Sequence, residues 1–194
     1  MPPKTQFSPE DVAQAAFDVV REQGIEALSA RRVALRLKSS VAPVYTCFNS
    51  MSELKQQVLL KARDLLYQYT TTTYTSRVFL NIGTGMVLFA RDHRQLFRAL
   101  FLTDSDHRVI LDELFDVFKM EMRNDARLVS LSDSECEALL TKMWIFTHGL
   151  ASLICVGLIE DHTQNFIVET LSSVGSLIIQ QILADSLRIH FPEG

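Results

Sequence analysis

Apolar residues in the first fifty positions of the chain recur three or four residues apart and form three short groups. The first group places Val12, Ala16 and Val19 on one side of a helix, and Ser8-Pro9 before it favours a helix start. Gly24 then favours a helix end. The other two groups are shorter, and each follows a serine that can cap a helix. We therefore predict three helices here, over residues 9–23, 30–37 and 41–48.

Longer apolar periodicities fill the rest of the chain. Ser50-Met51-Ser52-Glu53 is a capping box, and the apolar positions that begin with Leu54 and Val58 repeat every four residues after it. Seven Gly and five Pro in 194 residues are too few for a fold of many short strands. We predict an all-α protein of about nine helices, the last five over residues 77–90, 93–102, 105–127, 132–159 and 163–189.

Charge is distributed unevenly along the chain. The whole chain has 19 basic and 23 acidic side chains, but residues 1–63 have nine basic and six acidic ones. A polyanion would therefore be attracted to the N-terminal third and repelled by the remainder. Together with the helix pattern, this predicts a three-helix domain over residues 1–52 and a larger helical domain over residues 53–194.

The three cysteines and the longest apolar segment bear on location. Cys47, Cys136 and Cys155 are widely spaced and form no CxxC pair, so neither a disulfide framework nor a zinc knuckle is expected. The first residues lack the apolar segment of a signal peptide. Residues 143–159 are uncharged, but polar residues interrupt them, and a buried helix explains them better than a membrane span. We expect a cytoplasmic protein with no membrane partner.

The two short helices after Gly24 have the physical features of a helix-turn-helix. A tight turn joins them, a longer helix precedes them, and the basic residues Arg31, Arg32, Arg36 and Lys38 lie within this unit. The helix over 41–48 has small or neutral outward side chains, which permits close approach to a DNA major groove. Trihelical packing also occurs in domains that do not bind DNA, so both interpretations remain open.

Two segments carry a resemblance to a known family. The runs Ser29-Ala30-Arg31-Arg32-Val33-Ala34 and Ser40 to Ser50 (SVAPVYTCFNS), followed by Glu53-Leu54, resemble the DNA-binding domain of the tetracycline-repressor (TetR) family. Residues 144–153 (WIFTHGLASL) resemble the Trp and His-Gly signature of one type of C-terminal domain in that family. The resemblance covers nearly the whole chain. This sequence differs at the turn, where Lys38-Ser39 replaces the usual Gly and apolar residue, and at Met51, where a basic residue is frequent.

The resemblance implies a role for each residue of the motif. Tyr45 would contact a backbone phosphate, Arg31 and Ser40 would help to seat the motif, and Lys38 or Lys55 would replace the missing basic residue at position 51. Apolar contact with thymine methyl groups would form part of the base readout. The predicted DNA-binding residues are Arg31, Lys38, Ser40, Val41, Ala42, Tyr45, Thr46, Cys47 and Lys55.

Two uncharged segments near the C-terminus predict self-association. Residues 143–159 and 170–184 lack charges, so the two helices cannot both face water. They could form the core of a single chain. We favour an isologous homodimer built as a four-helix bundle, which is also the arrangement that the family resemblance implies. The predicted interface residues are Ser152, Leu171, Val174, Ile178 and Ile182.

The larger domain is rich in Phe and Met, beyond what a helical core of its size needs. An apolar pocket for a small-molecule effector could form among these residues, although for each residue taken singly the sequence favours ordinary core over a ligand wall. The Trp and His of the second signature are four residues apart and could add a polar contact. The predicted ligand-binding residues are Phe89, Phe97, Phe101, Phe115, Phe118, Met122, Trp144 and His148.

Catalytic and metal-binding patterns are weak in this sequence. The clusters at 104–107 (DSDH) and 160–162 (EDH) lie at predicted helix junctions, where helix capping explains them better than metal binding. No phosphate loop, nucleotide fingerprint or nucleophile elbow is present. We expect no enzyme activity, no catalytic residue, no cofactor and no metal. The predicted function is a regulator, and more specifically a repressor, that binds a palindromic DNA operator as a homodimer and is released by a mostly apolar effector. The alternative is a helical interaction module without a DNA role.

Overall fold

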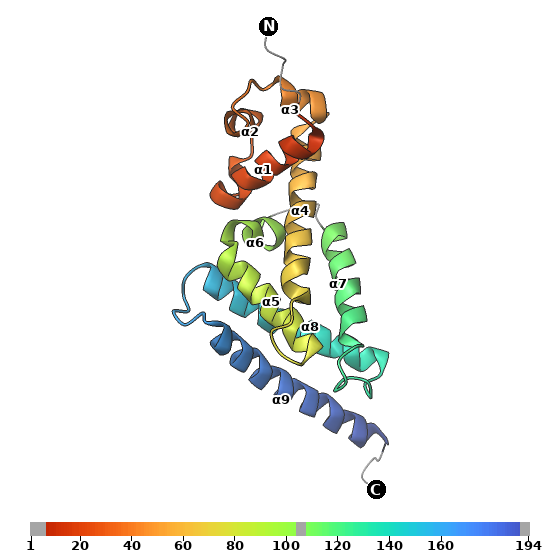
Figure 1. Cartoon of the computed structure of the whole chain (residues 1–194). Coiled ribbons are helices and arrows are strands. Elements are labelled where there is room, and N and C mark those ends of the chain that lie inside the picture. Colours follow the sequence, from red (N-terminus) through yellow and green to blue (C-terminus); the bar gives the residue numbers. More distant parts are fainter. Residues whose placement is uncertain (1–6, 104–107, 191–194) are drawn as a thin grey trace. The chain divides into compact units, whose positions relative to one another are not determined.

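The computed structural model describes residues 7–103 and 108–190, and these residues form nine α-helices, one short 3₁₀ helix and no strand (Figure 1). The predicted all-α class and the number of helices are confirmed for this part of the chain. The helices are α1 (Pro9–Gln23), η1 (Ile25–Ala27), α2 (Ala30–Arg36), α3 (Ala42–Cys47), α4 (Met51–Thr71), α5 (Val78–Asp92), α6 (Arg94–Phe101), α7 (Arg108–Met122), α8 (Asp133–Cys155) and α9 (Gln164–His190).

The chain divides into two compact units. The first consists of the described residues up to Leu65 and those from His93 to Ile110, and the second contains Leu66–Asp92 and the described residues from Leu111 onward. By packing, the first unit therefore extends beyond the boundary that we predict after residue 52. It includes α6, because that helix packs against α1 and η1.

The first unit is built around α1. Ser8 and Asp11 form a capping box at its start, in which the Asp11 N–H donates to Ser8 Oγ and the Ser8 N–H donates to the Asp11 carboxylate. Gly24 ends the helix with a positive φ of 88°. The apolar side of α1 packs against α2, α3 and α6. Fully buried side chains from these elements and from α4 form one core: Val12, Ala16, Val20, Val33, Val44, Leu54, Val58, Leu96 and Phe97.

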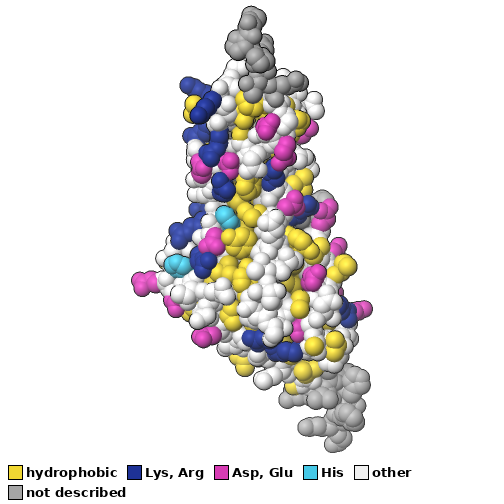
Figure 2. All heavy atoms as spheres, viewed as in Figure 1, with side chains coloured by type: hydrophobic (Ala, Val, Ile, Leu, Met, Phe, Trp, Pro, Cys, Tyr) yellow, Lys and Arg dark blue, Asp and Glu magenta, His cyan; other side chains and the backbone are white. Residues whose placement is uncertain are grey.

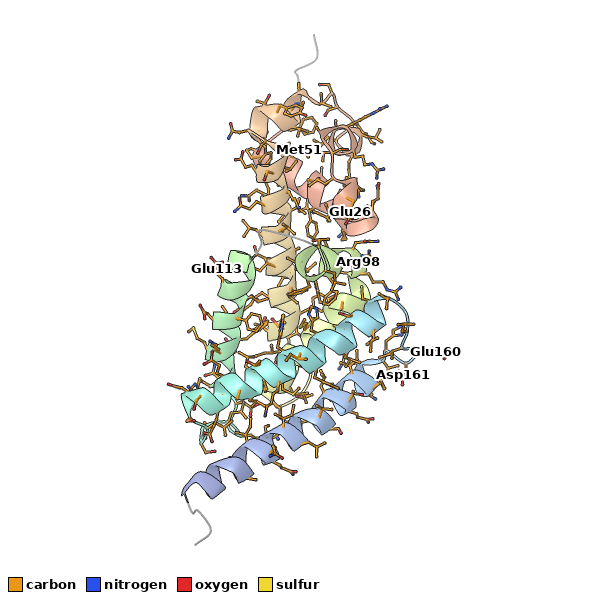
Figure 3. The ribbon with its side chains drawn as sticks, turned by 180° about the vertical axis from the view of Figure 1, so that it is seen from behind. Glu26, Met51, Arg98, Glu113, Glu160 and Asp161 are labelled. Carbon is orange, nitrogen blue, oxygen red and sulfur yellow. The ribbon has the colours of Figure 1, made fainter. Side chains whose placement is uncertain are left out.

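The second unit is built around α5, which packs against α8 and α9. Nearly all of α5 from Leu80 to Ala90 is buried. Gly85 lies so close to the end of α4 that a Cβ there would come within 2.1 Å of the Tyr69 carbonyl oxygen, so this crossing requires glycine. The helices α8 and α9 run beside each other in opposite directions (Figures 1 and 3).

Two helix ends differ from the prediction. The segment predicted as helical to 127 leaves the helix after Met122, because Asp125 bonds the backbone N–H of Arg127 in a turn that replaces the helical pattern. The segment predicted to reach 159 ends at Cys155. There Gly157 has a positive φ of 78°, and Leu158 donates its N–H to the carbonyl of Leu153 at 3.0 Å. These features form a Schellman cap.

Candidate DNA-binding motif and ligand pocket

The turn between α2 and α3 has the geometry of a helix-turn-helix with an unusual residue at its centre. Ser29 caps α2 by accepting the N–H of Arg32. After α2, Lys38 has a φ of 53°, in the left-handed region that favours glycine. Its N–H donates to the Leu35 carbonyl at 3.1 Å, and the Ser39 N–H donates to the Ala34 carbonyl at 3.0 Å. Lys38 therefore adopts the conformation that glycine usually supplies.

One face of α3 is exposed because the other face anchors the helix. Val44 and Phe48 are 1% and 7% exposed and pack into the first unit. On the opposite face, Tyr45 is 60% exposed, and Val41 at its start is 42% exposed. The exposed Thr46 donates its hydroxyl to the Ala42 carbonyl at 2.9 Å, so its oxygen can act toward a ligand as an acceptor. Ala42 is exposed as well, so four of the predicted DNA-binding residues, Val41, Ala42, Tyr45 and Thr46, lie on the exposed part of this motif.

The exposure of two further residues, Cys47 and Leu35, bears on the surface of this motif. The Cys47 thiol is half-buried, and its Sγ lies 3.6 Å from the carbonyl oxygen of Phe7, so it points toward the chain before α1. Leu35 in α2 was not predicted as a surface residue, yet it is 77% exposed. The sequence carried a weak signal for it, because Leu35 falls outside the apolar stripe of Val33, Ala34 and Leu37.

The basic residues of α2 have two different roles. Arg36 makes a bidentate pair with Glu22, at 2.6 and 2.7 Å, and this pairing raises the pKa of Arg36 and lowers that of Glu22. Arg32 donates to Gln23. These two arginines hold α2 on α1. Arg31 is exposed and takes part in none of the ion pairs among the described residues, so its charge is available to a partner.

Figure 2 shows Lys and Arg side chains gathered along the edge formed by α1 and α2. Lys38 and Ser40 are exposed in the turn beside this edge. Lys55 is half-buried and borders a shallow groove with Met51, both on α4, so it lies at a separate place from the turn. Figure 3 shows Met51 at the start of α4, close to α3.

A pocket opens within the second unit. Its walls come mainly from α5, α7, α8 and α9. The cavity volume is about 60 Å³. Ligand pockets for drug-sized molecules usually have several hundred Å³, so the pocket is narrow in this state. Most of its lining is apolar: Phe79, Leu80, Ile82, Met86, Phe118, Leu128, Leu140, Met143, Trp144, Leu171 and Ile179.

Four of the eight predicted ligand residues either line this pocket or pack against Trp144, which lines it. Phe118 and Trp144 line it. Phe115 packs edge-on against Trp144, with ring centroids 4.3 Å apart, and the ring centroids of Trp144 and His148 are 5.6 Å apart. Burial lowers the pKa of His148, so the ring favours its neutral form.

The other four predicted ligand residues do not line this pocket, and their assignment to it is corrected. Phe97 and Phe101 belong to the first unit and pack against each other with centroids 5.1 Å apart. Phe89 is fully buried and packs edge-on against Tyr69. Met122 is 1% exposed, and neither it nor Phe89 lines the pocket. Their apolar character reflects packing within the chain.

Polar groups in the pocket were missed from the sequence. Arg77 donates from Nη1 to Ser172 Oγ at 2.8 Å. Asp125 is 6% exposed and accepts the N–H of Phe79 and that of Arg127, each at 3.1 Å. Arg77, Asp125, Arg127 and Ser172 are the polar residues of this group that line the pocket. They come from three distant segments, so no local pattern in the sequence marks them as neighbours.

Much of the outer side of α8 and α9 is apolar and exposed. We define the α8–α9 apolar face by its exposed residues, which are Ile145 (67%), Leu153 (43%), Val156 (56%), Leu177 (64%) and Leu183 (40%). Among the predicted interface residues, Ser152, Val174 and Ile178 are half-buried on these helices. Leu171 and Ile182 are 1% and 6% exposed, so they are corrected to core positions, Leu171 as part of the pocket wall. Both helices are long and apolar enough to cross a membrane by length and composition alone.

The acidic cluster at 160–162 makes capping bonds within its own loop. Asp161 accepts the N–H and hydroxyl of Thr163, at 3.0 and 2.8 Å, and the backbone bond lowers its pKa. Figure 3 shows Glu160 and Asp161 in the loop between α8 and α9. The cluster at 104–107 lies outside the described residues. Within the described residues, no group of three or more His, Cys, Asp or Glu side chains is arranged to hold a metal ion.

The fold is shared with two solved structures. One is a transcriptional regulator from Rhodococcus sp. Rha1, which is 19% identical and superposes with a TM-score of 0.67 over 90% of this chain and 97% of its own. The other is a proposed transcriptional regulator from Pseudomonas aeruginosa PAO1, which is 12% identical, with a TM-score of 0.65 over 91% of this chain and 92% of its own. At these identities the similarity shows a common fold. No protein-family profile matches the chain, and no curated protein sequence matches it at a significant level.

Proposed function

We propose that the chain is a transcriptional regulator of the TetR type that reads double-stranded DNA through α2 and α3. The observation that carries this proposal is the exposed face of α3, where Tyr45 and Thr46 point outward while Val44 and Phe48 fix the helix from behind. An α-helix presented in this way fits the major groove. The two solved structures with the same fold, both described as transcriptional regulators, support the proposal.

The composition of α3 suggests how such a surface would read DNA. The helix itself carries no charge, so phosphate attraction would come from Arg31 and Lys38 beside it. Tyr45 would donate its hydroxyl to a phosphate. Val41 and Ala42 suit thymine methyl groups, and Thr46 offers an acceptor to a base edge. Sequence preference would therefore rest on shape and apolar contact more than on charged hydrogen bonds.

The α8–α9 apolar face suggests that two copies of the chain associate. Exposed Ile145 on α8 and Leu177 on α9 would be costly in water, and a second copy offers the same face in return. A two-fold axis through such a dimer would present two copies of α3, and the DNA site would then be an inverted repeat. This arrangement would cover the exposed apolar side chains of the two helices without a membrane.

The pocket in the second unit suggests regulation by a small molecule. Its walls are apolar, and it is narrow in this state, so a ligand would have to displace side chains such as Met143 to enter. Such a ligand would prefer the arrangement with displaced side chains. If DNA prefers the other arrangement, the ligand weakens DNA binding by the same free energy by which DNA weakens ligand binding. We therefore propose a repressor that an effector releases.

A selection of random duplex DNA on the purified full-length chain tests the proposal. The expected result is an inverted-repeat consensus whose half-sites are about one helical turn apart, since two copies of α3 would reach successive major grooves. Recovery of unselected sequence, with weak and uniform binding, would contradict the proposal and favour a helical interaction module without a DNA role.

A further inference from the structure

Charged and polar groups gather at one place in the largely apolar pocket. The lining includes Arg77, Asp125 and Arg127, and Ser172 accepts a hydrogen bond from Arg77. We propose that this pocket binds an amphipathic organic anion, with an apolar body and a single acidic head group that Arg77 holds. The inference rests on the proposed role of the pocket as an effector site, and it names the chemical class of that effector.

The backbone before α5 holds Arg77 in place. Asn81 is 7% exposed, and its Oδ1 accepts the Thr75 N–H at 2.8 Å and the Thr75 hydroxyl at 2.9 Å. Its Nδ2 donates to the Thr75 carbonyl at 2.9 Å. The Arg77 N–H in turn donates to Thr75 Oγ1 at 3.1 Å. This network fixes the backbone at Arg77, and the hydrogen bond to Ser172 orients its guanidinium, so less conformational freedom is lost when the arginine binds a ligand.

The guanidinium of Arg77 has donors to spare. It has five N–H donors, and one nitrogen, Nη1, bonds Ser172 Oγ at 2.8 Å. Arg77 forms no ion pair among the described residues, although it borders a largely apolar space. A partly desolvated guanidinium gains strongly from a carboxylate that accepts two parallel hydrogen bonds.

The nearby carboxylate does not satisfy that charge. Asp125 uses Oδ2 to accept the N–H of Phe79 at the start of α5 and Oδ1 to accept the N–H of Arg127. Its negative charge is thus directed at the positive end of the α5 dipole. Two arginines and one aspartate line the pocket, which leaves a net positive charge there. An acidic head group would balance it.

The rest of the pocket is suited to an apolar body. Met86, Phe118, Met143 and Trp144 form walls without charge. The free space of about 60 Å³ holds only a few atoms, so a longer body must displace a flexible side chain such as Met143. Trp144 lies in this wall and is the one tryptophan in the sequence, so its fluorescence reports on occupation of the pocket.

The experiment is a fluorescence titration of Trp144 in the full-length protein with matched pairs of probes. The pairs are decanoic acid with decanamide, and 4-phenylbutanoic acid with 4-phenylbutanamide. Each pair differs in the charge of the head group and shares the body. The unmodified chain is expected to bind at least one acid about tenfold or more tightly than its amide, as expected for a charge-assisted hydrogen bond in a partly buried site.

Variants assign the preference to one residue. Arg77→Gln is expected to bind acid and amide equally, near the amide affinity of the unmodified chain, whereas Arg77→Lys keeps part of the preference. Arg127→Gln, whose exposed side chain lies in the same pocket, is expected to keep most of it. Thermal unfolding of each variant shows whether it is folded.

Three results would overturn the inference: no saturable response to either acid, equal affinity for acid and amide in the unmodified chain, or an acid preference that survives Arg77→Gln. The inference and the proposed function fail separately. If an amide binds equally well and releases DNA, the regulator proposal survives without the acid preference. If an acid binds through Arg77 but no DNA sequence is selected, the pocket assignment survives without the regulator.

Discussion

The Ser39 N–H donates to the Ala34 carbonyl at 3.0 Å, and this bond closes the end of α2 across the turn that leads to α3. It requires a left-handed residue at position 38, where the chain has a lysine with a φ of 53°. A Cβ in this conformation costs about 1–2 kcal/mol relative to the right-handed region. The helix-turn-helix geometry is therefore kept at some expense in stability.

Replacing Lys38 with glycine is expected to stabilise the protein. Glycine removes the Cβ conflict, although its greater freedom in the unfolded chain offsets part of the gain, so the net effect should be about 0.5–1 kcal/mol. Chemical denaturation measures it. Lys38→Ala is the matched control, because it removes the same charge but keeps the Cβ. Equal stability of the two variants would argue against strain at this turn.

Tyr45→Phe is expected to weaken DNA binding and leave stability unchanged, because Tyr45 is 60% exposed and only its hydroxyl is removed. Arg31→Ala should reduce the salt dependence of binding by about one unit of slope. Titrations of a selected duplex at several salt concentrations measure both effects. Tyr67→Phe, at a tyrosine 41% exposed on α4, is the control and should bind as the unmodified chain does. Unchanged affinity and slope in Tyr45→Phe and Arg31→Ala would remove this surface from the DNA contact.

Leu177→Asp and Ile145→Asp, at residues 64% and 67% exposed, are expected to give folded monomers. Each places a carboxylate on the α8–α9 apolar face, which costs several kcal/mol if a second copy covers that face and little if water does. Sedimentation without detergent, with circular dichroism for helix content, measures the outcome. Met120→Asp is the control, because Met120 is 72% exposed on α7 and outside this face. Variants that still sediment as dimers would show that another surface associates.

His148 is expected to make the protein less stable in acid. Burial lowers the pKa of His148 below the ordinary value of 6.5, so below pH 6.5 the unfolded chain binds more protons than the folded chain. Stability should therefore fall as the pH is lowered from about 7 to 5.5. In His148→Gln this fall should be smaller, while His162→Gln, at an exposed histidine, should follow the unmodified chain. Identical pH profiles of denaturation for all three proteins would contradict this assignment.

Gly175→Ala is expected to raise stability and weaken ligand binding together. Alanine improves helix propensity in α9 by about 1 kcal/mol. Its methyl group would lie 3.6 Å from Sδ and Cε of Met143, an ordinary contact that fills space in the pocket. Thermal unfolding and the Trp144 titration measure the two effects. A stabilised variant with unchanged ligand affinity would show that the ligand does not occupy this part of the pocket.

Local patterns in the sequence predicted the helices and the exposed face of α3, but the prediction that Ser40 caps α3 is wrong, because Val41 occupies the cap position and no side chain makes a capping bond there. Ser8, Ser29 and Ser50 cap helices as predicted, because capping depends on residues only three positions apart. The left-handed Lys38 was visible only as a departure from the usual glycine. Its conformation follows from the packing of α2 and α3, which no local preference of lysine predicts.

The pocket was predicted less well, because it depends on contacts between distant segments. Phe97 was counted as a ligand residue, but α6 packs against α1, so that its ring belongs to the first unit. Arg77 and Ser172 are 95 positions apart and meet only in the folded chain. A surplus of aromatic residues indicated an apolar interior, and it carried no information on which of them surround an open space.

The most direct measurement of the central proposal compares two duplexes of equal length and composition, the inverted repeat recovered by selection and a scrambled version of it. Fluorescence anisotropy of each at physiological salt gives the ratio of their affinities for the full-length protein. The account predicts a ratio of about a thousand or more, as for other sequence-specific proteins, and a reduction of that ratio in a Val41→Ala, Thr46→Ala double variant, which loses contacts to base edges, whereas Tyr45→Phe should weaken both duplexes alike. Equal affinities for the two duplexes would contradict it.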